Sequence, residues 1–242
     1  MGNTVGSLRQ DNKISSRERA IIIGTILGDA HLGKTKNGVR LEIGHSNHQK
    51  LYVFWKYRAL RRFAGAAPHL IKINDDRYQR TYQQWRFKTR THETFARLHD
   101  IFYPKGKKIV PKFIDNLLNS PLSLAVWFMD DGGRRNDSYG LFLNTLSFSE
   151  SDHERLRQCL KKNFSLETRL HWISDGYRLY IPSGEAVRFC GLVDRYLIPS
   201  MKYKLPYNPV TTSFARLDRA RDRKIKKDLT LENSYKTSVS SN

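Results

Sequence analysis

The sequence predicts a mixed α+β protein made of two similar units of roughly 100 residues each. A short apolar run that ends in an aspartate occurs twice, at residues 22–30 and 124–132. After each run, strand-like alternation and helix-like periodicity follow in the same order. A repeat of this length indicates one domain-sized unit used twice, because solenoid repeats are much shorter.

The chain is strongly basic, and this indicates its partner. Its 242 residues include 43 Lys and Arg against 23 Asp and Glu, which gives a net charge of +20. A polyanion is the expected partner. Nucleic acid is favoured over a membrane surface or an acidic protein, because the basic residues are spread along the chain among Tyr, Trp and Gln. No segment has the 18 or so uninterrupted apolar residues of a membrane-spanning helix.

Two cysteines, Cys159 and Cys190, are too few and too far apart for a zinc site or a disulfide framework. We therefore expect a reducing, intracellular location, either a mitochondrion or chloroplast or a prokaryotic cytoplasm. The histidines show no metal-ligand spacing and are expected to be surface or core residues.

The first unit is expected to span residues 15–118, after an N-terminal arm at 1–14. Ser15 and Glu18 fit a capping box at the start of a buried helix that carries Gly24 and Gly28 on one face. These glycines either allow close approach of another backbone or merely break the helix, and the repeat of the motif favours close approach. The expected elements are this helix, hairpin arms at 30–36 and 39–45, a helix from 46 to about 63, hairpin arms at 69–74 and 77–89, and helices at 92–102 and 111–118.

The second unit is expected to span residues 119–206 and to repeat this order. Ser120 and Pro121 supply an N-cap and a first-turn proline, and Gly132 follows the buried run. The expected elements are this helix, strands within 139–148, a helix capped by residues 151–154, hairpin arms at 169–174 and 177–181, and a helix at 183–197. A basic tail at 207–242, partly disordered, completes the chain.

The aspartates at the ends of the two runs predict a metal site. A carboxylate is unfavourable at the C-terminal end of a helix, where the helix dipole attracts cations. If the two helices pack side by side in parallel, Asp29 and Asp131 converge with two helix C-termini. Carboxylates with backbone carbonyls form a magnesium-type ligand set, and metals beside a phosphodiester can activate water. In a chain this basic, the prediction is a metal-dependent nuclease.

The two runs resemble the LAGLIDADG motif, and residues 124–133 resemble the form that the motif takes at its second occurrence. With Lys107, Lys108 and Pro111, and with the segment 197–206, the chain resembles the single-chain, two-motif homing endonucleases, especially the branch encoded by yeast mitochondrial introns. The resemblance covers roughly residues 15–206. Val126, Trp127 and Phe128 are bulkier than the idealised motif, which implies an asymmetric helix interface.

This resemblance implies a fold, a cofactor and residue roles. The fold is an αββαββα unit used twice, with the motif helices packed at the centre and two antiparallel sheets forming a DNA-binding saddle. Asp29 and Asp131 would be catalytic metal ligands, helped by the carbonyls of Gly28 and Asp130, with Lys108 and Lys204 as catalytic lysines. The metal would be Mg²⁺, two ions or more; Mn²⁺ could replace it, and Ca²⁺ would support binding without cleavage.

The sheets are expected to read DNA, since Arg, Lys and Gln on a strand can reach base edges in the major groove. Each candidate could equally contact phosphate or only solvent. The candidates are Arg40, Glu42, Arg77, Arg80, Gln84, Arg86 and Lys88 in the first unit, and Asn144, Ser147, Arg169, His171, Trp172, Arg178 and Tyr180 in the second.

The leading hypothesis is a monomeric, site-specific endonuclease that cuts both strands of a long double-stranded DNA target across the minor groove and leaves short 3′ overhangs. One alternative is an RNA-binding intron maturase of the same fold. Another is a DNA-binding regulator that has lost catalysis, against which the two aspartates and two lysines argue.

Overall fold

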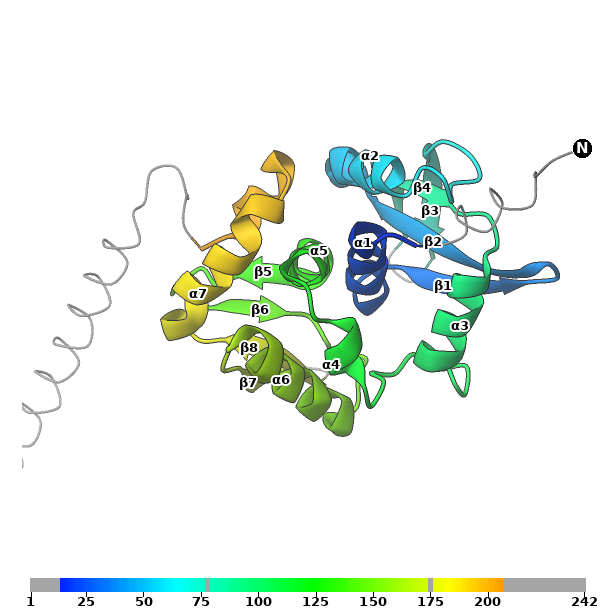
Figure 1. Ribbon diagram of the computed structural model, residues 1–242. Helices are drawn as coiled ribbons and strands as arrows, with labels where there is room; N and C mark the ends of the chain where they lie inside the picture. Colours follow the sequence, from blue (N-terminus) through cyan, green and yellow to red (C-terminus); the bar gives the residue numbers. More distant parts are fainter. Residues whose placement is uncertain (1–13, 77–78, 174–175, 207–242) are drawn as a thin grey trace, which may run out of the picture.

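Two halves of the molecule have the same order of elements, αββαββα (Figure 1). The computed structural model describes residues 14–76, 79–173 and 176–206. The first half contains α1 (Ser16–Leu27), β1 (His31–Thr35), β2 (Gly38–Ser46), α2 (Lys50–Ala59), β3 (His69–Asp75), β4 (Arg80–Lys88) and α3 (Glu93–Phe102). The short helix α4 (Ile114–Leu117) comes between the halves. The second half contains α5 (Pro121–Asp131), β5 (Gly132–Arg134), β6 (Leu141–Leu143), α6 (Glu150–Phe164), β7 (Arg169–Ile173), β8 (Gly176–Ile181) and α7 (Ser183–Val193).

Each half has one four-stranded antiparallel sheet, and the two sheets share one topology. The strand orders are β1-β2-β4-β3 and β5-β6-β8-β7. In β2, apolar side chains at alternate positions, such as Leu41 and Ile43, are buried, and the polar positions between them are partly open. One face of each sheet is therefore packed against helices, and the other face is left open to solvent.

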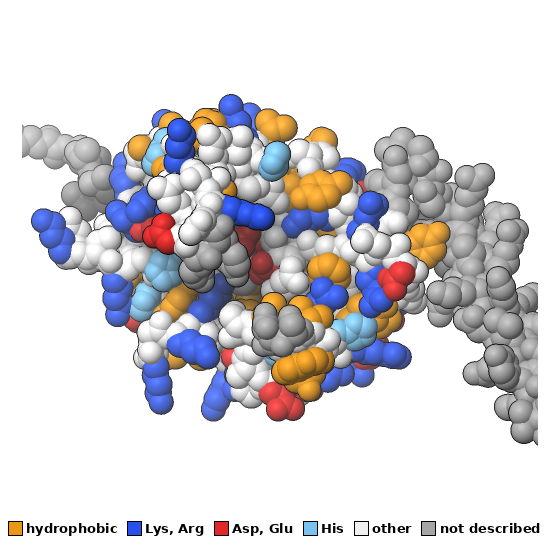
Figure 2. Space-filling view, turned by 180° about the vertical axis from the view of Figure 1, so that it is seen from behind, with side chains coloured by type: hydrophobic (Ala, Val, Ile, Leu, Met, Phe, Trp, Pro, Cys, Tyr) orange, Lys and Arg blue, Asp and Glu red, His pale blue; other side chains and the backbone are white. Residues whose placement is uncertain are grey.

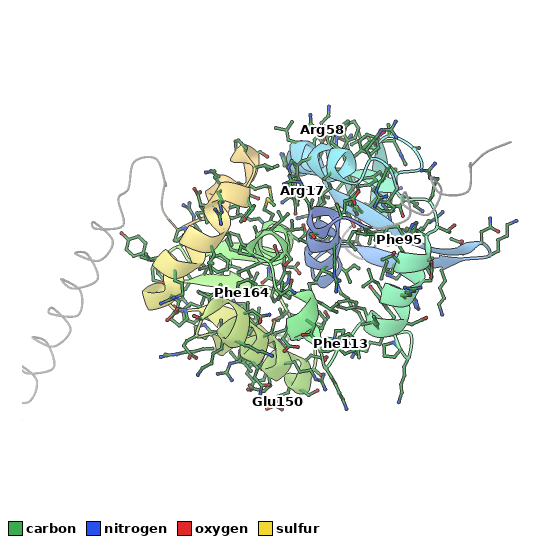
Figure 3. All side chains as sticks on the ribbon, in the orientation of Figure 1. Arg17, Arg58, Phe95, Phe113, Glu150 and Phe164 are labelled. Carbon is green, nitrogen blue, oxygen red and sulfur yellow. The ribbon has the colours of Figure 1, made fainter. Side chains whose placement is uncertain are left out.

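Apolar side chains fill the space between helices and sheets in both halves. Phe95 of α3 and Phe164 of α6 are both buried, one in each half of the molecule (Figure 3). The buried residues form one continuous core that includes both α1 and α5. Within the described ranges, we find no helix that combines the length and the apolar character needed to cross a membrane.

Helices α1 and α5 lie side by side at the centre of the molecule (Figure 1). A Cβ placed on Gly24 would lie 2.4 Å from the backbone oxygen of Ser123, and one on Gly28 would lie 2.4 Å from the Cβ of Asp130. Only glycine permits this separation. The expected close approach at both glycines is therefore confirmed, as is the expected pair of αββαββα units with their motif helices at the centre.

Short-range sequence signals predicted the starts of two helices and the β-hairpins correctly. The capping box of Ser15 and Glu18 is present, Ser120 caps α5, and the predicted hairpins are formed. The expected helix cap within 151–154 is wrong: Ser149 is the N-cap of α6, in a capping box with Asp152. The side chain of Ser46 makes no cap hydrogen bond, because a short 3-10 turn, Asn47–Gln49, precedes α2.

Four predicted elements are shorter than expected, among them the helix expected at 111–118, which spans only Ile114–Leu117. Helix α2 ends at Ala59 rather than near 63, and α7 ends at Val193 and continues as a 3-10 turn at Asp194–Tyr196. The strand expected within 139–148 stops at Leu143, and the chain then turns toward the centre of the molecule. A 3-10 helix, Pro199–Lys204, contains the expected basic segment. The arm at 1–13 and the tail at 207–242 lie outside the described residues, and the proposed unit boundaries remain predictions.

Candidate active site

The two motif helices bring Asp29 and Asp131 to one pocket. Asp131 is the last residue of α5, and Asp29 follows Gly28, which caps the end of α1. A pocket of about 290 Å³ opens between them, lined by Leu27, Gly28, Asp29, Lys108, Asp131, Asn144, Leu146, Ser147 and Phe148. Seen from behind (Figure 2), acidic side chains occupy a hollow at the middle of the molecule, with Lys and Arg side chains around it. The predicted convergence is present.

Two lysines cap the C-terminal ends of these helices in equivalent ways. Lys108 Nζ donates to the carbonyl oxygens of Leu27 at 3.3 Å and Gly28 at 2.8 Å. Lys204 Nζ donates to those of Met129 at 2.5 Å and Asp130 at 2.9 Å. A cation here satisfies carbonyls that the helix leaves without a partner and complements the helix dipole. Burial lowers the pKa of both lysines, although the nearby aspartates oppose the shift.

Both the side chain and the backbone of Asp29 make polar contacts with other residues. Its carboxylate Oδ2 lies 3.2 Å from Nδ1 of His45, and its backbone N–H donates to the carboxylate of Asp130 at 3.2 Å. Burial tends to raise the pKa of Asp29, but the hydrogen bond with His45 and the charges of Lys56 and Lys204 outweigh it. The pKa of Asp29 is therefore below its ordinary value, so this carboxylate is ionised at neutral pH.

Asp130 lies at the centre of a buried polar cluster that joins the halves. Lys56 Nζ donates to its two carboxylate oxygens at 2.6 and 2.9 Å, and the Tyr52 hydroxyl donates to Oδ1 at 2.7 Å. Lys56 and Tyr52 come from α2 of the first half, whereas Asp130 comes from α5 of the second. Lys56 is fully buried, so its pairing with Asp130 compensates two charges that would otherwise be costly to bury. Burial and Asp130 raise the pKa of Tyr52 well above its ordinary value.

Asp131 has a different environment. In the part of the chain that the structure describes, its carboxylate has no hydrogen-bond partner, although its backbone carbonyl accepts from the N–H of Asn144 at 3.0 Å. Burial, followed by the charges of Asp29 and Asp130, raises the pKa of Asp131 to about 8. Lys108 and Lys204 offset this only in part. Negative charge at this end of the site is therefore incompletely compensated by the protein.

The donor set fits a hard divalent cation. Two carboxylates, from Asp29 and Asp131, line one pocket, and the Gly28 carbonyl belongs to the same pocket. Burial, followed by the charges of Asp29 and Asp130, raises the pKa of Asp131, and a bound cation would counteract both by stabilising its ionised form. A second grouping, Asp29, His45 and Asp130, also places three ligand atoms within 4.8 Å of one another. That grouping is less suited to a metal, because Lys56 already occupies the carboxylate of Asp130.

Most predicted DNA-contacting residues of the first half share the open face of its sheet. In the register between β2 and β4, Glu42 lies opposite Lys88. Two residues further along β2, Gly44 lies opposite Arg86, so both pairs are on the same face of the sheet. Glu42 also lies 2.8 Å from Arg40 and 3.3 Å from Lys88, so it holds basic side chains in place. The predicted residues on this face are Arg40, Glu42, Arg80, Gln84, Arg86 and Lys88. Arg77 lies outside the described residues.

In the second half, the predicted residues divide into three groups. Arg169, His171, Arg178 and Tyr180 share the open face. Burial and the charges of Arg135, Arg178 and Arg169 lower the pKa of His171, which reflects how basic this face is. Trp172 pairs with Tyr177 on the opposite face. Asn144 and Ser147 lie in the turn after β6 and line the central pocket rather than the sheet.

Comparison with known proteins identifies the family. The profile of the LAGLIDADG DNA endonuclease family matches residues 19–189, which is most of the chain. The chain belongs to the LAGLIDADG family. It is 30% identical over 206 residues to a probable intron-encoded endonuclease of Wickerhamomyces canadensis, covering 83% of this chain and 88% of that one. It is 28% identical over 209 residues to the DNA endonuclease I-ChuI of Chlamydomonas applanata, covering 79% and 95%.

The fold of this LAGLIDADG protein also matches a solved family member. The homing endonuclease I-WcaI, bound to its DNA recognition sequence, superposes with a TM-score of 0.75 at 28% identity, covering 86% of this chain and 96% of that one. The cytochrome b mRNA maturase bI2 of Debaryomyces hansenii is 29% identical over 194 residues, covering 76% and 72%. Family and fold together make the chain a homing endonuclease, as the sequence predicted.

The sequence did not predict the buried polar cluster around Asp130 in this endonuclease. His45 was expected to be a surface or core residue without a functional role, yet it contacts Asp29. A weak signal was present, since His45 continues the alternation of Val39, Leu41 and Ile43 on the covered face of β2. No short-range sequence pattern indicated that Lys56 or Tyr52 belongs to this cluster, because their partner Asp130 lies more than 70 residues away in the sequence.

Proposed function

We propose that this endonuclease cuts both strands of a long, specific double-stranded DNA target, using divalent metal held by Asp29 and Asp131. The observation that carries the proposal is the single pocket that both aspartates line, with Lys108 at its wall. The carbonyls of Gly28 and Asp130 complete the proposed ligand set, and each also accepts a lysine hydrogen bond. Mg²⁺ is the proposed ion, in two copies or more, with Mn²⁺ as a substitute and Ca²⁺ supporting binding only.

The protein and the metal would contribute different parts of the chemistry. Bound Mg²⁺ would supply positive charge to the phosphodiester and make a bound water more acidic. Lys108 and Lys204 have a lowered pKa, so they exchange a proton with water more readily than surface lysines do. In their charged form they stabilise negative charge that develops at the phosphate. Both are proposed as catalytic residues.

The open sheet faces on either side of the pocket are the proposed DNA-reading surfaces. Each is basic, and each would follow the major groove while the minor groove crosses the pocket. Cleavage across the minor groove would leave short 3′ overhangs. One chain carries both halves, so we propose that it acts as a monomer, which the mass of its complex with DNA would test.

The catalytic assignment is tested with a target selected from a randomised DNA library in the presence of Mg²⁺. Asp29→Asn and Asp131→Asn should each abolish cleavage of both strands, while binding measured in Ca²⁺ persists. Asp100→Asn is the matched control, because Asp100 is an exposed carboxylate on α3 that does not line the pocket. Robust cleavage by either pocket variant would refute the metal assignment.

The base-reading assignment can be tested with two adjacent glutamines. Gln84 is on the open face of β4, whereas Gln83 pairs with Lys72 on the other face. Gln84→Ala should relax sequence preference at one target position by about 1–3 kcal/mol, which is the discrimination of one good bidentate base contact. Gln83→Ala should leave the preference unchanged. Equal effects of the two variants would refute a base-reading role for this face.

A second candidate function is that of an intron RNA maturase. Two relatives are named cytochrome b mRNA maturases, from Debaryomyces hansenii and Saccharomyces cerevisiae, the latter 31% identical over 218 residues. Splicing of the host intron RNA by the purified protein is the measurement. Splicing that persists in Asp29→Asn would establish a maturase activity separate from the nuclease site.

A further inference from the structure

His45 is a buried imidazole that lies between a pocket aspartate and a buried lysine. Its side chain is only 2% exposed. Nδ1 lies 3.2 Å from Oδ2 of Asp29, and Nε2 lies 3.1 Å from Nζ of Lys56. The ring of Tyr52 packs against the imidazole, with the two ring centroids 5.0 Å apart. Nδ1 of His45 therefore faces Asp29, and Nε2 faces Lys56 at hydrogen-bond distance, with Oδ1 of Asp130 farther away at 3.7 Å.

These partners fix which nitrogen carries the proton. A lysine ammonium has three donors and no acceptor. Because the ammonium of Lys56 cannot accept a hydrogen bond, its 3.1 Å contact with Nε2 requires Nε2 to be the acceptor and therefore unprotonated. The ring proton is then on Nδ1, which donates it to the carboxylate of Asp29. Lys56 thus determines that His45 presents a donor, and not a lone pair, to Asp29.

Lys56 itself is held in place by the other half of the molecule. It donates to both carboxylate oxygens of Asp130 on α5. Oδ2 of the same carboxylate also accepts the backbone N–H of Asp29. The main chain and the side chain of Asp29 are therefore both fixed by one connected set of hydrogen bonds that crosses between the halves. Asp131 has no comparable contact among the described residues.

We propose that His45, held in its Nδ1–H tautomer by Lys56, is the positioning residue for Asp29. Its hydrogen bond occupies one oxygen of the carboxylate and fixes its rotation, so that the other oxygen is presented to the pocket in one orientation. Of the two aspartates that line the pocket, His45 contacts Asp29 and, among the described residues, not Asp131, so its loss should affect the two strands of the target unequally. This effect on cleavage rests on the proposed nuclease function, whereas the tautomer is independent of it.

Two amide substitutions separate positioning from packing. The amide of asparagine lies where Nδ1 of histidine lies, and the amide of glutamine lies where Nε2 lies. His45→Asn keeps a donor for Asp29, whereas His45→Gln moves the amide toward Lys56. Both variants retain a polar side chain at the same buried position, so each is a control for the other.

The measurement is strand-resolved cleavage of an end-labelled duplex target with Mg²⁺. His45→Gln should change the ratio of the two strand rates by roughly 10- to 150-fold, since one lost hydrogen bond to a charged group is worth roughly 1.5–3 kcal/mol and each 1.36 kcal/mol is a factor of about ten. Nicked DNA should accumulate. His45→Asn should keep the ratio within about threefold of wild type, and both variants should bind DNA normally in Ca²⁺. An equal slowing of both strands in both variants, or an unchanged ratio in His45→Gln, would overturn the proposal.

A second measurement does not depend on cleavage. Imidazole ¹⁵N NMR of the metal-free wild-type protein, with the His45 signals assigned by their loss in His45→Gln, should show a proton on Nδ1 and none on Nε2. A proton on Nε2 would overturn the tautomer assignment. If the tautomer is as expected but Asp29→Asn still cleaves DNA, the proposed function fails and the tautomer assignment stands.

Discussion

Asp29 and Asp131 are equivalent positions in two copies of one unit, but their surroundings differ. Asp29 accepts from a buried imidazole, its backbone is bound to Asp130, and its pKa is lowered. Asp131 has no side-chain partner in the described ranges, and its pKa is raised to about 8. The symmetry of the fold therefore reproduces the placement of the two carboxylates without reproducing their electrostatics.

The difference arises from contacts between the halves. Helix α2 of the first half supplies Lys56 and Tyr52 to Asp130 of the second half. In the other direction, Asp152 of α6 accepts the backbone N–H of Val110, two residues after Lys108. Each half thus stabilises a part of the other that lies close to the pocket. The first half does so with a buried ion pair, Lys56 with Asp130, beside Asp29, and the second half with a hydrogen bond that Asp152 accepts from the backbone near Lys108.

The largest expected effect comes from removing the buried ion pair on the Asp29 side. Lys56→Met leaves the carboxylate of Asp130 buried without its cation, so the free energy of unfolding should fall by about 3–5 kcal/mol. Urea denaturation measures this. Lys162→Met is the control in the second half: Lys162 is 68% exposed in its pair with Asp115, so its loss should leave the free energy of unfolding almost unchanged. If the free energy of unfolding fell by a similar amount in both variants, the buried pair would be no more stabilising than the exposed one, which would contradict the structure.

The lysines that cap the motif helices give the next largest effect. Lys108→Met and Lys204→Met should each slow cleavage on the order of 10²-fold, because each removes a positioned charge near the pocket. Strand-resolved cleavage would show whether each lysine serves one strand. If both variants slow both strands equally, the two halves act as one site despite their different environments.

The contact between the motif helices can be tested at a glycine of α1. A Cβ on Gly24 would meet the backbone of Ser123, so Gly24→Ala should destabilise the protein by about 1–3 kcal/mol. Gly191 in α7 has no atom within 4 Å of its added Cβ. Gly191→Ala should therefore be neutral or stabilising by up to about 1 kcal/mol. Thermal unfolding of both variants measures the difference, and a neutral Gly24→Ala would show that the helices are not in close contact.

The two aspartates should also differ in how they affect the pH dependence of stability. Because the folded-state pKa of Asp131 is about 8 and the unfolded value is near 3.8, the unfolded chain releases this proton first as pH rises. The contribution of Asp131 to the free energy of unfolding is then present at low pH and is lost as pH rises toward about 8. Asp131→Asn should raise the Tm of the metal-free protein by on the order of ten degrees at pH 8, and by less at pH 5. Asp29→Asn should not raise the Tm at pH 8, since the pKa of Asp29 is lowered.

Local sequence signals were sufficient for much of the fold. The capping box at Ser15, the first-turn Pro121 and the alternation in β2 each reflect interactions within a few residues. The repeat then indicated which helices pair and that Asp29 and Asp131 converge at their ends, and the family resemblance indicated Lys108 and Lys204. These features required only short-range chemistry, one internal comparison and the family resemblance.

The remaining features depend on long-range contacts. The pairing of Lys56 with Asp130 forms only once the two halves have packed together. The strand β6 ends early because the turn after it approaches the pocket, where Asn144 and Ser147 lie. Trp172 faces away from Arg169 and His171, because neighbouring residues of a strand alternate between its two faces. Adjacent residues such as His171 and Trp172 therefore cannot both contact the same DNA groove from this strand.

The contact between α1 and α5 at Gly24 and Gly28 also restricts the DNA that can bind. With no room for the helices to slide or separate, the two sheets keep a fixed spacing and a fixed rotation about the DNA axis. One extra base pair at the centre of the target would move one half-site by about 3.4 Å and rotate it by roughly 35°, since B-DNA has about 10–10.5 base pairs per turn. We therefore expect target sites to tolerate substitutions between their half-sites but not insertions or deletions.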